Sequence, residues 1–345
     1  MVLSADLDSG LDAAEALSRL HPTNPFCTLS YLQAMRARSE QAWTLTLHDE
    51  HGVRDACLCH LLVGRVNRSL IIPSLPALAA EPAFWEEVAR QCRVLRVSRL
   101  ELNAYCSPAM TIPAVQGESR RRTRFEYFVD MRGGDLWTVL HENHRRRVRK
   151  AAKAGLELRC EAGDAACSEH AKLMASSMER RTERGEEVPT QFALRSFKPL
   201  LQSGAGRLYQ AVRGAQIISS VLLLLSSQGA YLHSGGTGPE GMELGASHWL
   251  HHELMKQLAA EGKLIYNLGG TEDDSSGLAL FKARFGAQVR RLQAVEAFPG
   301  NSLRSRLSLL ARRLEDGSRQ LRQAASRKRG GSPAPAGGAG KQEGA

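Results

Sequence analysis

Hydrophobic and polar positions in the first third of the chain form a mixture of helical and strand-like patterns. Apolar residues recur every three to four positions in some segments, while other segments are short apolar or alternating runs. The elements expected here are helices over residues 11–20, 30–38 and 82–92, the second capped by Ser30, and strands over 43–48, 53–63, 69–72 and 99–104. The pattern predicts a mixed α/β lobe.

The second part of the chain shows a more ordered series of patterns. Residues 107–123 contain Pro, Gly and Arg without apolar periodicity, which indicates a crossing between two lobes. After it we expect strands over 125–131, 156–161, 206–212, 217–226, 230–235, 264–268 and 288–298, and helices over 135–154, 165–183, 191–201, 246–260 and 278–285. A polar loop is expected at 185–190.

These patterns divide the chain into four parts. We expect an N-terminal lobe over 1–115 and a C-terminal lobe over 116–300. A basic amphipathic helix is predicted over 301–325, and the tail 326–345 lacks core-forming residues and is expected to be disordered. The fold class is therefore α/β, with two lobes of mixed, mostly antiparallel sheet flanked by helices.

Charge adds a possible class of partner to this picture. The chain has 345 residues and a formal net charge of +10. Residues 117–153 hold 11 Lys and Arg against 5 Asp and Glu, a local excess of 6. Such a patch favours a polyanionic partner, for example coenzyme A, tRNA, a nucleotide-linked precursor or an anionic lipid surface.

The cysteines and the hydrophobic runs bear on the compartment. Seven cysteines without a C-x-x-C pair favour reduced thiols and argue against a zinc site. No signal peptide is recognisable, and the longest apolar run, residues 217–225, is much shorter than the ~20 residues that span a bilayer. We expect a cytoplasmic protein with peripheral contact to the inner face of a membrane as an option.

The predicted helix over 135–154 is both amphipathic and basic. Trp137, Leu140, His144, Val148 and Ala151 share one stripe, and the opposite face carries arginines and lysines. His144 is therefore expected to be a hydrogen-bonded core histidine. The basic face is either a phosphate-binding ridge, with Arg145, Arg149 and Lys150 as its candidates, or a solvated surface.

Two glycine-rich segments are candidates for ligand binding. YLHSGGT (231–237) followed by GPEGMELGASHWL (238–250) predicts a strand, a turn and a helix start, where free amides can hold a pyrophosphate. YNLGGTEDDSSGLALFKARFG (266–286) predicts a strand ending at Asn267, a turn, and a short helix capped by Asp274 or Ser275. Leu278, Phe281 and Phe285 share a face of that helix, and Lys282 points to one side, by position alone at the surface.

Three motifs in this order resemble a known family. HRRRVRKAAKAGLEL (144–158), the YNLGGT strand end and GLALFKARFG (277–286) are similar to the GNAT-type acyltransferase domain of the FemAB-like and polysaccharide-associated acetyltransferases. NPFCTLSYLQAM (24–35) also resembles the opening of their first lobe, so the similarity spans about residues 22–298. The resemblance implies two GNAT-like lobes with the ligand cleft mainly in the second.

The resemblance also implies roles for individual residues. Lys282, at the position of the family lysine, would face a phosphate-bearing substrate, and His233 and Glu243 are the candidate proton acceptors. Acyl-CoA would contact Ser234, Gly235, Gly245, Ala246 and Ser247. The substrate would contact Arg145, Arg149, Lys150, Tyr231, Asn267, Gly269, Gly270 and Phe281. The acyl-CoA loop of GNAT enzymes aligns on MELGAS (242–247) with its first and last positions changed, and no long helical insertion typical of tRNA-using Fem enzymes is evident.

We therefore expect an N-acyltransferase that moves an acyl group, from acyl-CoA, to an amine of a small molecule or of a cell-envelope or polysaccharide precursor by direct attack in a ternary complex. Backbone amides of the strand at 230–235 would polarise the carbonyl. No Ser/His/Asp or Cys/His set is recognisable, and neither a metal nor DNA is expected. Two alternatives stay open: an aminoacyl-tRNA-dependent aminoacyltransferase, and a non-catalytic module that binds RNA or anionic lipid.

Overall fold

The computed structural model describes residues 4–38, 40–64, 67–183, 197–274, 276–299 and 310. The expected amphipathic helix over 301–325 (apart from Leu310), the tail, the loop at 185–190 and the start of the helix expected at 191–201 lie outside these residues. Within the described part no helix is long and apolar enough to cross a membrane.

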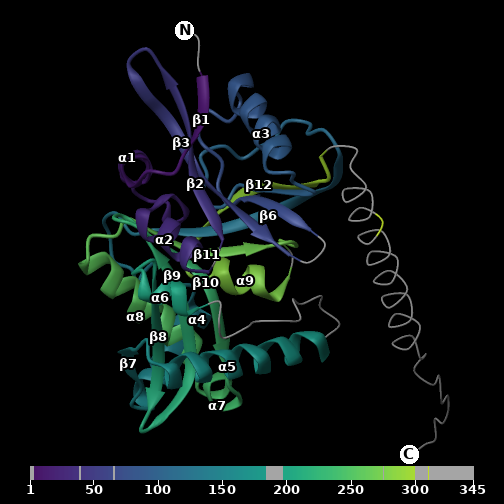
Figure 1. Cartoon of the computed structure of the whole chain (residues 1–345). Coiled ribbons are helices and arrows are strands. Elements are labelled where there is room, and N and C mark those ends of the chain that lie inside the picture. The colour runs from purple at the N-terminus through teal and green to yellow at the C-terminus, as the bar shows by residue number, and fades with distance from the viewer. Residues whose placement is uncertain are drawn as a thin grey trace, which may run out of the picture.

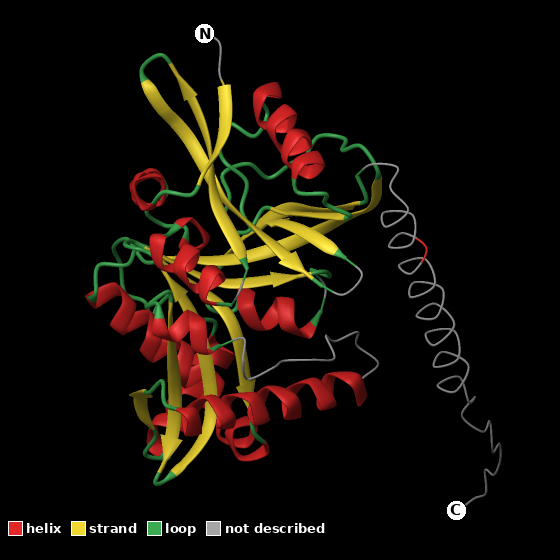
Figure 2. Ribbon diagram, in the orientation of Figure 1, coloured by secondary structure: helices red, strands yellow, loops and turns green. Residues whose placement is uncertain are grey.

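A single twelve-stranded sheet runs through the described part of the chain, and helices cover both of its faces (Figures 1 and 2). Its strands, in spatial order, are β1 (Ser4–Asp8), β2 (Gln41–Asp49), β3 (Gly52–Val63), β4 (Arg68–Ile72), β5 (Arg99–Asn103), β12 (Gln288–Ala297), β6 (Glu118–Asp130), β11 (Ile265–Thr271), β10 (Gly229–Thr237), β9 (Gln216–Leu225), β8 (Gly206–Arg213) and β7 (Glu157–Cys160). The helices are α1 (Leu11–Leu20), η1 (Pro25–Cys27), α2 (Leu29–Ala37), α3 (Pro82–Val94), α4 (Glu142–Lys153), α5 (Asp164–Glu183), α6 (Lys198–Gln202), α7 (Pro239–Leu244), α8 (Ala246–Ala260) and α9 (Gly277–Ala283).

The predicted fold class is confirmed: the sheet is mixed and mostly antiparallel, with parallel pairing between β4 and β5 and between β10 and β11. The two expected lobes share this sheet, because β12 pairs with β5 on one side and with β6 on the other. The last strand of the expected C-terminal lobe, β12, thus pairs with β5 of the expected N-terminal lobe. The division at residues 115–116 stays a proposal.

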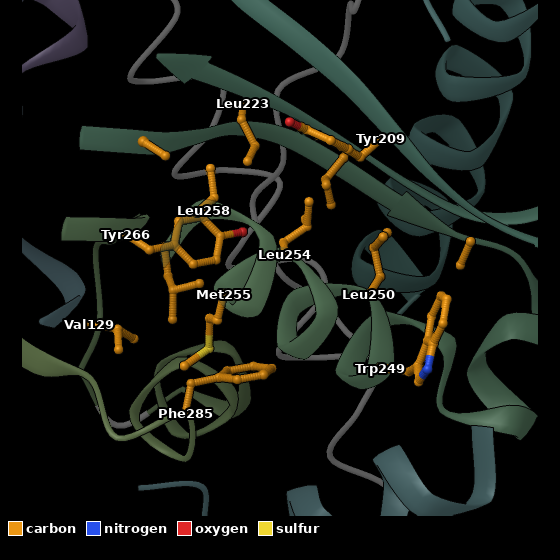
Figure 3. Packing of buried hydrophobic residues seen from close by; sticks show 14 of the residues in the cluster. Val129, Tyr209, Leu223, Trp249, Leu250, Leu254, Met255, Leu258, Tyr266 and Phe285 are labelled. Carbon is orange, nitrogen blue, oxygen red and sulfur yellow. The ribbon is translucent and has the colours of Figure 1, made fainter. Parts of the chain in front are cut away.

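Three hydrophobic clusters fill the space between sheet and helices. One lies under α4, α8 and α9, where Leu254, Met255 and Leu258 of α8 pack against Tyr266 and Phe285 (Figure 3). A second contains residues of α1, α2, α5 and α6, and a third packs α3 on the first strands. Burying a large apolar side chain contributes about 1.5–3 kcal/mol, so these clusters fix how the helices sit on the sheet.

Helix α4 begins at Glu142, not at Asp135 as predicted. His141 is its N-cap, and the His141 side chain accepts a hydrogen bond from the Asn143 amide. The preceding segment turns instead, because the Asp135 carboxylate accepts from the Trp137 amide. The buried stripe of α4 is therefore shorter than expected, although Gly155, with φ +70°, follows its end as predicted.

Other element boundaries also differ from the prediction. Thr28, not Ser30, caps α2, and Ser276, not Asp274 or Ser275, caps α9. Strand β11 continues to Thr271 instead of ending at Asn267, with an irregularity between Asn267 and Gly270. Strand β1 was not predicted, since its sequence SADLD carries only two apolar residues.

Candidate active site

The parallel pair β10 and β11 separates after a short contact. Their pairing covers only Gly229–Tyr231 against Ile265–Asn267, and β10 then has a bulge between Leu232 and Ser234. β10 remains paired with β9 on its other side. In Figure 1, β8, β9 and β10 run down the view while β11 and β6 run across it. We call this point of separation the fork.

Lys282 is at the fork and is buried, with 5% of its surface exposed. Its Nζ donates a hydrogen bond to the Gly270 carbonyl oxygen at 2.9 Å. A Cβ placed on Gly269 would lie 3.7 Å from Lys282 Nζ and 3.1 Å from the Leu232 carbonyl oxygen, so only glycine leaves this approach open. The expectation of a surface lysine is wrong, because the course of β11 brings Gly270 over the end of α9.

Burial, together with the nearby Arg124 and against the opposing effect of Glu126, lowers the pKa of Lys282 to about 7. At neutral pH this amine therefore exchanges between charged and uncharged forms, unlike an ordinary lysine. Such a group can bind an anion in one form and accept a proton in the other.

Glu126 of β6 is a site residue that the sequence analysis missed. It is 1% exposed, and its two carboxylate oxygens lie 3.3 and 3.2 Å from the backbone nitrogen of Cys106, which donates to them. Burial raises its pKa to about 7, although hydrogen bonds from Asn267 and Cys106 favour the charged form. The signal in the sequence was a carboxylate placed between two aromatic residues of the strand FEYFVDM.

Aromatic residues of both lobes pack beside this pair of titratable groups. The Arg124 guanidinium lies 5.2 Å from the centre of the Tyr105 ring. Tyr231 packs against Phe26 and Tyr105, with ring centres 4.9 and 6.2 Å apart.

The Asn267 side chain accepts a hydrogen bond from the Gly269 amide at 2.8 Å and thereby holds the glycine turn. The structure thus brings together Lys282, Gly269, Gly270, Tyr231 and Asn267 of the predicted site.

The two predicted proton acceptors are not part of this cluster. His233 lies on the β10 bulge with an exposed side chain, and the surrounding protein and Arg38 lower its pKa, so it is neutral at pH 7. Glu243 lies at the end of α7, where its carbonyl oxygen accepts a hydrogen bond from Lys150 Nζ at 2.9 Å. Ser234 is held by His170, whose Nε2 is 2.9 Å from its Oγ.

Helix α4 packs beside the predicted acyl-CoA loop. Gly245 has φ +81° and is buried, and a Cβ there would lie 3.2 Å from Arg147. Ala246 is fully buried and Ser247 partly so, whereas Met242 and Glu243 are exposed. A role of Gly235, Gly245, Ala246 and Ser247 in binding acyl-CoA stays a prediction.

The basic ridge of α4 is partly neutralised. Glu142 pairs with Arg145 at 3.1 Å and with Arg149 at 3.5 Å. Arg149 also lies over the Trp137 ring at 5.5 Å. His144, by contrast, is the core histidine that was predicted: it is 2% exposed, and its Nε2 lies 2.9 Å from the Phe281 carbonyl oxygen.

Phe281 is partly buried and packs against Phe285, whereas Leu278 of the expected shared face is 37% exposed. Among the described residues no group of three or more His, Cys, Asp or Glu side chains could hold a metal ion. All seven cysteines are free thiols.

Comparison with known proteins gives a match to one family model and several similar folds. Residues 140–276 match the family model described as the acetyltransferase (GNAT) domain. Among solved structures, FemX superposes with a TM-score of 0.65 at 11% identity, covering 86% of this chain and 97% of FemX. A comparison with curated proteins found no match.

Two further structures share the fold. A tandem GNAT protein from the clavulanic acid biosynthesis pathway gives a TM-score of 0.54 at 13% identity, covering 87% of this chain and 100% of its own. L-PGS from Bacillus licheniformis gives 0.51 at 12% identity, covering 88% and 97%. Residues 140–276 thus match a GNAT acetyltransferase domain, and the chain has the fold of FemX and of the tandem GNAT protein.

Proposed function

We propose that the chain transfers an acyl group from acyl-CoA to an amine, with the reacting groups meeting at the fork beside Lys282. The observation that carries this proposal is the buried Lys282 at the separation of β10 and β11, within a chain that contains a GNAT domain. Direct attack needs an amine held beside the carbonyl and a hydrogen-bond donor for the developing oxyanion.

Each group at the fork has a role in this proposal. Amides of β10 beyond Tyr231 polarise the carbonyl, since β11 no longer pairs with that part of the strand. Lys282 in its charged form offers its remaining N–H donors to a phosphate or to the oxyanion. Glu126 and His233 are the groups proposed to accept the proton of the attacking amine: Glu126 is buried and contacts the Cys106 amide, and His233 lies outside that cluster, on the bulge of β10.

The acceptor is proposed to be the amine of a small molecule or of a cell-envelope precursor, including a polysaccharide precursor, linked to a nucleotide or a lipid. The fold shared with FemX and L-PGS supports this, as does the basic charge of the chain. A cytoplasmic enzyme that contacts the inner face of a membrane would meet such a precursor.

A second candidate donor is aminoacyl-tRNA. The specific observation in its favour is that α4 packs beside the buried Gly245 and Ala246, which leaves less of the loop at 242–247 to hold the pyrophosphate of coenzyme A through its amides. A large donor bound through side chains would not need them.

A thermal-shift screen followed by turnover separates these readings. We expect acetyl-CoA or longer acyl-CoA to raise the melting temperature and to acylate amine acceptors, and charged tRNA to do neither. Stabilisation and transfer with charged tRNA alone would assign the second donor. Salt-sensitive RNA or anionic-lipid binding without transfer from any donor would contradict the enzymatic proposal in favour of a binding module.

A further inference from the structure

A pocket of about 240 Å³ lies between α4, α8 and α9, and its lining is basic on one side and apolar on the other. Its lining residues are Asn143, His144, Arg146, Arg147, His248, Gly277, Leu280, Phe281 and Arg284. This volume is below the roughly 300–1,000 Å³ of a pocket that holds a whole small ligand. It suits one end of a longer molecule.

The charge of the pocket is entirely positive. Three arginines contribute to its wall and no carboxylate does. Burial is the main cause that lowers the pKa of His144 to about 4, against the hydrogen bond with Phe281, and that of His248 to about 3, with help from His144 and nearby arginines, so the histidines are neutral at pH 7. Guanidinium groups bind phosphate oxygens through paired hydrogen bonds, which makes a phosphate the anion that fits.

The opposite wall supplies a surface for a flat ring. Phe281 is partly buried, and the neighbouring Leu280 is 50% exposed although it is a large apolar residue. The His248 and Phe281 rings lie 5.1 Å apart, edge to face. An apolar wall beside three arginines matches a nucleotide, whose base is aromatic and whose phosphates are anionic.

The position of the pocket connects it to the fork. Phe281 lines the pocket, and the next residue, Lys282, donates to Gly270 at the fork. Helix α9 therefore has the pocket on one side and the fork on the other. A donor with a nucleotide at one end and an acyl group at the other can occupy both.

We infer that this pocket binds the phosphates of a nucleotide carried by the acyl donor, through Arg146, Arg284 and Arg147. The link to the donor rests on the proposed acyl transfer, whereas the phosphate site itself does not. The shared chemistry is an adenosine phosphate, which is present in coenzyme A and at the 3′ end of tRNA.

Calorimetric titration of the full chain with adenosine 3′,5′-bisphosphate, coenzyme A and a short RNA ending in CCA tests the inference. We expect the double variant Arg146→Ala/Arg284→Ala to weaken binding by about 10- to 100-fold, because each lost contact is charge-assisted. The control is Lys153→Ala/Arg159→Ala, which removes two charges from positions outside the pocket and should change affinity by less than about threefold.

The three titrants identify the source of the phosphate. Binding of coenzyme A and of the bisphosphate, without binding of the RNA, assigns the pocket to coenzyme A, and pocket-dependent binding of the RNA assigns it to tRNA. Equal loss of affinity in the pocket and control variants, or no binding of any titrant by the wild type at 1 mM, would overturn the inference.

Turnover measured on the same proteins separates this inference from the proposed function. If the pocket variant loses nucleotide binding but no donor supports acyl transfer, the phosphate site stands and the proposed function fails. If the pocket variant transfers acyl groups with an unchanged KM for the donor, the proposed function stands and the pocket is not its phosphate site.

Discussion

Replacing Lys282 by Met is expected to reduce turnover by about one to two orders of magnitude. Met keeps an unbranched apolar stem in the buried space, whereas Ala would also leave a cavity beside Tyr127, whose ring centre is 6.0 Å from Nζ. The lost interaction is a charge-assisted hydrogen bond in the transition state, worth about 1.5–3 kcal/mol. At about 1.36 kcal/mol per tenfold change, that gives a factor of about 10–150.

The same substitution has a predictable effect on stability. The pKa of Lys282 is lowered from 10.5 to about 7 in the folded chain. Between these two pH values the Lys282 amine is therefore protonated in the unfolded chain and largely unprotonated in the folded chain. Stability contributed by this group therefore rises as the pH rises through that window. Lys282→Met should abolish this rise, so urea unfolding at pH 7 and pH 9 will show a smaller difference for the variant than for the wild type.

Steady-state kinetics of Lys282→Met, on protein with a melting curve close to that of the wild type, is the deciding assay. The control is Lys256→Met, which removes an exposed lysine from α8 that pairs with Glu253. A rate constant for Lys282→Met equal to that of the control would refute the argument that this amine acts at the fork. An unchanged pH dependence of unfolding would refute its lowered pKa.

Three further predictions follow from other parts of the structure. The wild type should lose stability as the pH rises from 4.5 to about 7, because the pKa of Glu126 is raised in the folded chain; Glu126→Gln should not show this loss. Urea unfolding of both proteins at pH 5 and pH 8 measures the difference. Arg149→Glu with Lys150→Glu should weaken anion binding by less than the pocket variant, because Glu142 already pairs with Arg149; calorimetry compares them, and a larger loss would contradict this. Deleting residues 326–345 should leave the melting temperature and turnover unchanged, and a drop of several degrees would show that the tail packs on the body.

Much of the fold could be predicted because its elements have strong local patterns. The strands that became β8, β9 and β10 are apolar runs separated by turn residues, and α8 follows with helical spacing. His144 was predicted correctly for the same reason, since its place within an apolar stripe requires a buried, hydrogen-bonded ring.

The site was less predictable, because it depends on contacts between segments distant in the sequence. The burial of Lys282 follows from the position of Gly270 on β11, and Glu126 accepts a hydrogen bond from the Cys106 amide, just before the crossing segment. The covering of Gly245 depends on how α4 packs, which no local pattern specifies. Local periodicity places a residue on a face, but it does not show which segment covers that face.

The position of β12 between β5 and β6 has a consequence for synthesis of the chain. At about 5–20 residues per second, the ribosome needs about 10–40 s to proceed from residue 103, where β5 ends, to residue 288, where β12 begins. Throughout this interval β5 has one unpaired edge, and β6, once synthesised, has two until β11 is made. An unpaired edge is a template for pairing with another chain. Aggregation therefore competes with folding while the second half of the chain is still being synthesised, and a chaperone that shields strand edges would act in this interval.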